Sequence, residues 1–153
     1  CISYLRLSQL DKALDAAKRA VELEPEIAET VTNLAIAYVR NRMYPEAIEA
    51  AEKAISMEPD YSIAYEIKGF ILLGAGRYNE AQETFQQAIA LDDNRCLSNL
   101  YLAAILNGQG DNIAAAKYVA KAKQDDCSIS PGVEQELRQL GLPGIDGLRK
   151  DSK

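Results

Sequence analysis

The sequence matches itself at an offset of 34 residues, and this internal repeat constrains the fold more than any other feature. Pro25 aligns with Pro59 in this register, and alanine fills two further columns. The columns are Ala13, Ala47, Ala81 and Ala115, and Ala20, Ala54, Ala88 and Ala122. A repeat of this length is typical of stacked arrays, in which each unit buries its apolar face against its neighbours. We therefore predict four stacked repeats, of which the first is shortened.

Each repeat has the apolar spacing of two helices. In the copy over residues 28–61, apolar residues recur at intervals of three and four. They form one stripe of Val31, Leu34, Ala35 and Tyr38 and a second of Ala47, Ile48, Ala51, Ala54 and Ile55. The stripes are separated by a break at 41–44, where the later copies have Gly76 and Gly110. The pattern predicts two antiparallel helices in each copy, which the alanine columns allow to approach closely.

Two segments carry a family resemblance, NLAIAYVRNRMYPEAIEAAEKAISMEP and KGFILLGAGRYNEAQETFQQAIALD. They resemble the tetratricopeptide repeat, whose signature places aromatic, Leu, Gly, Tyr, Ala, Phe, Ala and Pro residues in a 34-residue unit. The column that usually holds tryptophan in this family contains Val31, Tyr65 and Asn99 here. The resemblance implies an all-α fold, a right-handed superhelix of antiparallel helix pairs with a concave and a convex face.

The predicted array covers residues 1–127. Its copies are 1–27, 28–61, 62–95 and 96–127. The first copy begins at its eighth position, in the middle of a first helix, so we expect the chain to be a fragment with repeats or another domain missing upstream. The alternative, that Cys1 is the lipidated start of a lipoprotein, fits less well because helical periodicity begins at once.

A single helix is predicted after the array, over residues 128–141. Ser130 suits the N-cap position, Pro131 the first helical position and Gly141 the stop. Its one apolar stripe consists of Val133, Leu137 and Leu140. Such a helix would cover the open end of the last pair, as terminal caps do in stacked repeats.

The tail over residues 142–153 contains two glycines and a proline, and we predict that it is flexible. Its apolar residues Leu142, Ile145 and Leu148 are spaced at three. Docking of the tail onto an apolar surface is therefore the alternative.

Composition excludes several classes of function. With 17 basic and 23 acidic residues the net charge is -6, which disfavours binding to a phosphate backbone. The chain has no histidine, the commonest general base and transition-metal ligand. No apolar stretch approaches the 18 residues of a membrane span. We expect no catalysis, cofactor, metal site, nucleic-acid partner or membrane insertion, and acidity together with unpaired cysteines weakly favours the cytoplasm.

The three cysteines are Cys1, Cys96 and Cys127, an odd number at wide spacings without a CxxC motif. This pattern favours three reduced thiols in an intracellular protein. The alternative is a bridge between Cys96 and Cys127. It arises because antiparallel packing brings the start of a first helix close to the end of the second helix of the same pair.

The resemblance implies that a ligand binds along the concave face, which is lined by residues of the first helices. The candidate partner-binding residues are Asn33, Ile36, Val39, Arg40, Ile63, Ile67, Phe70, Leu73, Leu97, Leu100 and Tyr101. Soluble monomers seldom expose so large an apolar stripe, so we expect a cover. The candidates are a partner's amphipathic helix, an apolar peptide, a second copy of the chain or its own tail. In the alternative interpretation, several of these residues belong to the core.

The polar residues of this face exclude one known binding mode. Relatives that grip acidic C-terminal peptides use a clamp of Lys, Asn, Asn, Lys and Arg, of which only Asn33 is present. An asparagine ladder is also absent, because the equivalents of Asn33 are Ile67 and Tyr101. We therefore predict a non-catalytic protein-interaction scaffold that binds an apolar or helical segment. The alternatives are a homo-oligomerisation or assembly module and a regulatory or targeting region of a larger enzyme.

Overall fold

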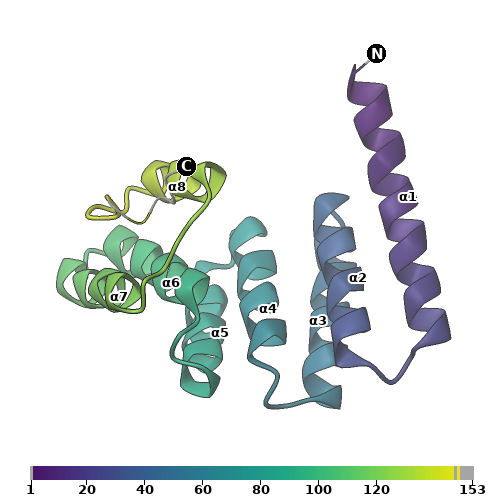
Figure 1. Ribbon diagram of the computed structural model, residues 1–153, viewed down its shortest axis with the longest axis horizontal. Helices are drawn as coiled ribbons and strands as arrows, with labels where there is room; N and C mark the ends of the chain where they lie inside the picture. Colours follow the sequence, from purple (N-terminus) through teal and green to yellow (C-terminus); the bar gives the residue numbers. More distant parts are fainter. Residues whose placement is uncertain (1, 147, 149–153) are drawn as a thin grey trace. The chain divides into compact units, whose positions relative to one another are not determined.

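The computed structural model describes residues 2–146 and 148, with the side chains of residues 2–8 left out (Figure 1). Its eight described elements are all α-helices. They are α1 (Ile2–Leu23), α2 (Ala28–Arg40), α3 (Tyr44–Met57), α4 (Ser62–Gly74), α5 (Tyr78–Leu91), α6 (Cys96–Gly108), α7 (Asn112–Gln124) and α8 (Pro131–Gln139). None of these described helices has the length and apolarity of a membrane span. The chain forms two compact units, Cys1–Thr84 and Phe85–Lys153, and their boundary falls within α5.

In the first unit, α2 packs antiparallel to α3, and α3 packs in turn against α4 (Figure 1). The predicted alanine columns lie in these contacts, where a small side chain lets two helix backbones approach. The buried cluster contains Ala28, Val31, Ala35, Ala47, Ala50, Ala51, Ala54, Ala64 and Ile71. Gly74 extends the close packing, because an added Cβ would lie 3.1 Å from Cε1 of Tyr44. The predicted helix pair over 28–61 is therefore confirmed.

The N-terminal helix differs from the prediction. A shortened first copy predicted a turn near residues 7–10, whereas α1 is one helix of 22 residues. That stretch, Leu-Ser-Gln-Leu, contains neither glycine nor proline, so nothing in its sequence breaks the helix. The side chains of Ile2–Ser8 lie outside the described residues. Further along, α1 packs against α2, and Asn41 donates a hydrogen bond of 3.4 Å to the carbonyl of Leu10.

The turn inside each helix pair uses a residue in the left-handed conformation. Arg42, Gly76 and Gly110 are spaced at 34 residues and have φ angles of 58°, 77° and 89°. The following N–H groups close the turns onto earlier carbonyls, at 2.9 Å for Met43 to Tyr38 and 2.8 Å for Arg77 to Leu72. Glycine adopts this conformation without steric cost, whereas a Cβ makes it unfavourable by roughly 1–2 kcal/mol. Arg42 is therefore a source of local strain.

Replacing Arg42 by glycine is expected to raise the free energy of unfolding by about 0.5–1 kcal/mol, since the strain exceeds the extra backbone entropy that glycine loses on folding. Gly76→Ala should lower it by a similar amount. Urea unfolding followed by circular dichroism measures both changes. A stabilising effect of Gly76→Ala, or a destabilising effect of Arg42→Gly, would contradict this account of the turns.

In the second unit, α6 packs against α7 and is buried along most of its length, from Ser98 to Leu106. The capping helix predicted after the array is α8. Its N-cap, Ser130, accepts a hydrogen bond of 3.3 Å from the N–H of Val133, and Pro131 begins the helix, as predicted. Leu137 is fully buried at the contact of α8 with α6. It stands where the repeats carry a small residue, so no further closely packed pair follows it.

The described part of the tail is docked rather than free. Leu142, Ile145 and Leu148 are all buried, and the carbonyl of Leu148 accepts a hydrogen bond of 2.9 Å from the N–H of Ile129. Of the two predictions for this segment, docking therefore describes residues 142–146 and 148. Burying three apolar side chains offsets the entropy of ordering a short, glycine-containing segment. The rest of the predicted flexible tail, 147 and 149–153, lies outside the described residues.

Cys96 and Cys127 form a disulfide, with their Cα atoms 5.6 Å apart. The prediction of three reduced thiols is wrong for these two residues, and the alternative is correct. Cys96 begins α6, and Cys127 follows the turn after α7, so the antiparallel pair brings them together. Disulfides are typical of oxidising compartments, which removes the cysteine argument for a cytoplasmic location.

Candidate functional site

The predicted site residues of the first unit lie on two neighbouring helices. α2 and α4 run side by side in the same direction (Figure 1). The 34-residue offset pairs Asn33 with Ile67 and Ile36 with Phe70. We call this surface the α2–α4 face. It consists of Asn33, Ile36, Val39 and Arg40 on α2 and of Ile63, Ile67, Phe70 and Leu73 on α4.

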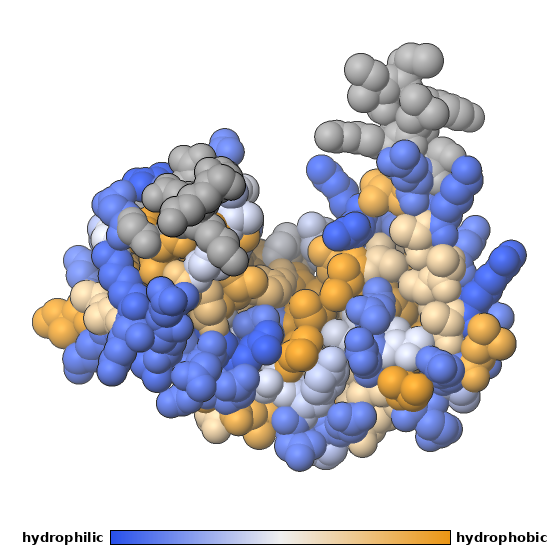
Figure 2. Space-filling model, in the orientation of Figure 1, coloured by the Kyte–Doolittle hydropathy of each residue, from blue (hydrophilic) through white to orange (hydrophobic). Residues whose placement is uncertain are grey.

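Side chains of the α2–α4 face reach solvent to different degrees. Asn33, Arg40 and Ile63 are exposed, and the other five are half-buried. Val39 and Ile67 pack partly against the core of the first unit, so the alternative of core residues applies to their inner sides. Figure 2 shows apolar side chains at the molecular surface over α4. The face thus combines a packed base with an accessible apolar surface.

The polar groups on the α2–α4 face are available for binding. Within the described residues, the side chains of Asn33 and Arg40 make no hydrogen bond or ion pair. Thr32, which the sequence also placed toward this surface, is buried and donates a 2.8 Å hydrogen bond to the carbonyl of Ala28. Its hydroxyl is therefore already satisfied, and Asn33 and Arg40 remain the polar contacts.

The three predicted site residues of the second unit are largely covered. Leu97 is half-buried, but Leu100 and Tyr101 are only 0% and 4% exposed, so the prediction that they lie on an open surface is wrong. The ring of Tyr101 stacks on Phe85 with a centroid distance of 6.1 Å. Its hydroxyl donates a 2.7 Å hydrogen bond to Oε2 of Glu136 in α8. The C-terminal helix of the chain therefore covers this part of α6.

The environment of Tyr101 keeps its hydroxyl protonated. Burial, and then the hydrogen bond to the Glu136 carboxylate, raises the pKa of Tyr101 above its usual range. A second contact ties the same segment down, because Nδ2 of Asn107 donates a 2.9 Å hydrogen bond to the carbonyl of Gly141. Sequence reasoning missed this cover because Glu136 lies on the polar side of a short helix. Its distance of 35 residues from Tyr101 follows the repeat register only approximately.

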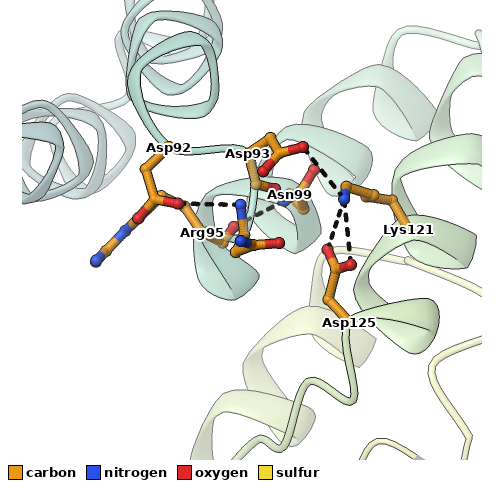
Figure 3. Close-up of polar contacts among 7 residues, drawn as sticks. Asp92, Asp93, Arg95, Asn99, Lys121 and Asp125 are labelled. Atoms are coloured by element: carbon orange, nitrogen blue, oxygen red, sulfur yellow. Dashed lines mark hydrogen bonds and ion pairs between the residues drawn. The ribbon is translucent and has the colours of Figure 1, made fainter.

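A polar cluster fixes the loop between α5 and α6 to the end of α7 (Figure 3). Nζ of Lys121 lies 3.4 Å from Oδ2 of Asp93 and 3.1 Å from Oδ2 of Asp125. Nδ2 of Asn99 donates to the carbonyls of Asp93 and Arg95, at 3.1 and 2.9 Å. The hydrogen bond to Asp125 is the main cause that raises the pKa of Lys121.

This cluster has a structural role beside the disulfide. Asn99 is buried and holds the loop by its amide, which explains a polar residue in a column that elsewhere holds Val31 and Tyr65. Sequence reasoning missed this role, although the polar residue in an apolar column was a signal. No group of acidic or cysteine side chains in the described ranges could hold a metal ion.

A comparison with protein-family models identifies the repeat. The model of the tetratricopeptide repeat matches residues 2–62, 32–95 and 68–127, and so most of the chain. The chain belongs to the tetratricopeptide repeat family. This confirms the all-α fold class predicted from the repeat, and tetratricopeptide repeats are a protein-interaction fold. A comparison with curated proteins finds no match.

Several solved structures share this tetratricopeptide fold. A crystal structure of MamA is 22% identical, with a TM-score of 0.70 over 88% of this chain and 75% of that chain. MamA from Desulfovibrio magneticus RS-1 is 18% identical, with a TM-score of 0.68 over 82% of this chain and 71% of that chain. The first tetratricopeptide domain of Spaghetti (RPAP3), bound to the HSP90 peptide SRMEEVD, is 21% identical, with a TM-score of 0.62 over 71% of this chain and 86% of that chain. At these identities the likeness shows the fold.

Proposed function

We propose that this chain is a non-catalytic interaction module that binds an apolar or helical peptide segment on its α2–α4 face. The observation that carries the proposal is the accessible apolar surface of Ile36, Ile63, Phe70 and Leu73, bordered by the unpaired polar side chains of Asn33 and Arg40. An amphipathic helix in an apolar groove is a recurrent mode of peptide recognition. Contiguous apolar surface with a polar rim is typical of such interfaces.

A protein of the same fold supports peptide binding as a function class. The RPAP3 domain is seen with an HSP90 peptide that ends in two acidic residues around valine, SRMEEVD. Of the polar clamp that suits such peptides, this chain has only Asn33. We therefore expect the ligand here to depend more on apolar contacts than on its terminal carboxylate.

Substituting Phe70 by aspartate is expected to weaken peptide binding at least about 100-fold, because the change removes a large apolar contact and places a charge on the face. The probe is a set of 14-residue amphipathic peptides selected from a display library against the unaltered chain. Fluorescence anisotropy measures their affinity, and circular dichroism checks that helicity is unchanged. Ile63→Asp, at a residue 36% exposed, tests the same face with less risk to the core.

Ile113→Asp is the matched control for these variants. Ile113 lies on α7 and is 77% exposed, so the same chemical change is made away from the face. Its binding should be unchanged. If Phe70→Asp and Ile63→Asp bind as well as the control, the α2–α4 face is not the site.

Self-association is the second use to which the same apolar face could be put. It predicts a molar mass that rises with concentration in light scattering and returns to the monomer value in Phe70→Asp. A monomer at all concentrations leaves the peptide as the ligand of this face.

A further inference from the structure

We propose that the ligand of the α2–α4 face is a helix of about three turns, antiparallel to α2, whose acidic N-terminal turn lies against Arg40 and Arg42. The inference rests on the proposed function and specifies the chemistry and direction of the partner. It follows from the order of residues along the face, from the two unpaired arginines and from the strained backbone of Arg42.

The face is arranged in rows across α2 and α4. Successive rows join Asn33 to Ile67, Ile36 to Phe70 and Val39 to Leu73. The α4 side is apolar throughout, whereas the α2 side ends in Arg40. From Asn33 to Arg40 the rows span seven residues, or roughly 10 Å at 1.5 Å per residue. A partner helix of about three turns, roughly 16 Å long, would cover these rows and extend past Arg40 toward the turn.

Two cations stand at one end of this surface. Arg40 is the last residue of α2, and Arg42 follows in the turn; both are exposed. Neither guanidinium has a hydrogen bond or ion pair in the described part of the chain. By contrast, Arg77 is paired with Glu80, and Arg138 with Glu134 and Asp146. Unpaired arginines in a chain of net charge -6 indicate a surface that complements carboxylates.

The backbone of Arg42 is a second, independent observation. Arg42 has a φ of 58°, in a turn where the two later copies have Gly76 and Gly110. An arginine is therefore retained where glycine would be more stable. Strain of this kind is found where a side chain serves binding. A positive charge beside Arg40 is what the side chain adds.

The direction of the partner follows from the helix dipoles. α2 and α4 both end beside Arg40, and the C-terminal ends of helices carry partial negative charge. The N-terminus of a partner helix carries partial positive charge, and its first turn favours Asp and Glu. An antiparallel partner therefore places its positive pole near the ends of α2 and α4 and its acidic first turn on the two arginines.

The test selects 14-residue helical peptides from a randomised display library, using the unaltered chain as bait. We expect the selected peptides to be enriched in Asp and Glu in the first turn and in apolar residues at helical spacing thereafter. Arg40→Glu combined with Arg42→Glu should weaken their binding about tenfold at low salt, and raised salt should reduce the difference. Arg40→Gln combined with Arg42→Gln should give a smaller loss and leaves the helix end without a new acidic charge.

Lys12→Glu combined with Arg19→Glu is the matched control, because it changes the net charge equally at exposed positions of α1. Binding by this variant should equal that of the unaltered chain. Selected peptides without acidic enrichment, or equal binding by the charge-reversed face and the control, would overturn the inference while Phe70-dependent binding upholds the proposed function. Peptides that bind independently of Phe70 would overturn both.

Discussion

Removing the Cys96–Cys127 disulfide is expected to lower the free energy of unfolding of the second unit by about 2–4 kcal/mol. The bridge closes a loop with a sequence separation of 31 residues, and chain-entropy estimates for a loop of this length fall in that range. The variant is Cys96→Ser combined with Cys127→Ser. Urea unfolding in the absence of reductant measures the difference.

Reductant provides the control for this prediction. The unaltered chain should lose the same free energy when dithiothreitol is added, whereas the double variant should not respond. Mass spectrometry after alkylation of the unreduced protein should show a single reactive thiol, at Cys1. Three alkylated cysteines, or equal stability of the two proteins without reductant, would contradict the bridge.

Replacing Leu137 by alanine is expected to lower the free energy of unfolding by about 3 kcal/mol, since its side chain is fully buried where α8 meets α6. The change should loosen α8 and expose Tyr101. Hydrogen exchange should then increase in residues 128–146 more than in α7. Gln139→Ala, at an exposed position of the same helix, should have little effect.

The ionisation of Tyr101 gives an independent measure of the same contact. Its pKa is raised by burial and by Glu136, so folding favours the protonated phenol. The stability that this contributes is complete below the ordinary tyrosine pKa of about 10 and is lost as pH rises through the raised value. Glu136→Gln removes the carboxylate without a cavity. In that variant an ultraviolet titration should show the pKa of Tyr101 moving back toward its ordinary value, and an unchanged pKa would contradict the contact.

Much of the fold could be read from local patterns. Apolar residues at intervals of three and four place a helix, and glycine at positions such as Gly76 marks its turn. The Ser130 and Pro131 pair located the start of α8 because N-capping depends on neighbouring residues only. For the site, the same patterns brought Ile36, Phe70 and their neighbours to one face, since residues 34 apart occupy equivalent places on successive helices.

The predictions that failed concern contacts between distant residues. A stripe of Leu100 and Tyr101 has the same helical spacing whether solvent or α8 covers it. The pairing of two cysteines depends on the separation of their Cα atoms, 5.6 Å here, which sequence spacing leaves open. The continuous α1 reflects the lack of a breaking residue in its first ten positions, a local signal that the repeat register concealed.

Periodicity and turn residues are properties of neighbouring positions, and the helix pairs, their close contacts and the family followed from these alone. Which apolar surfaces remain accessible was decided only in three dimensions. Within the second unit α8 and the tail bury apolar side chains of α6 and of their own, because the gain in buried area outweighs the entropy of ordering a short segment. In the first unit the α2–α4 face keeps accessible apolar side chains, and there the left-handed turn puts Arg42 beside Arg40.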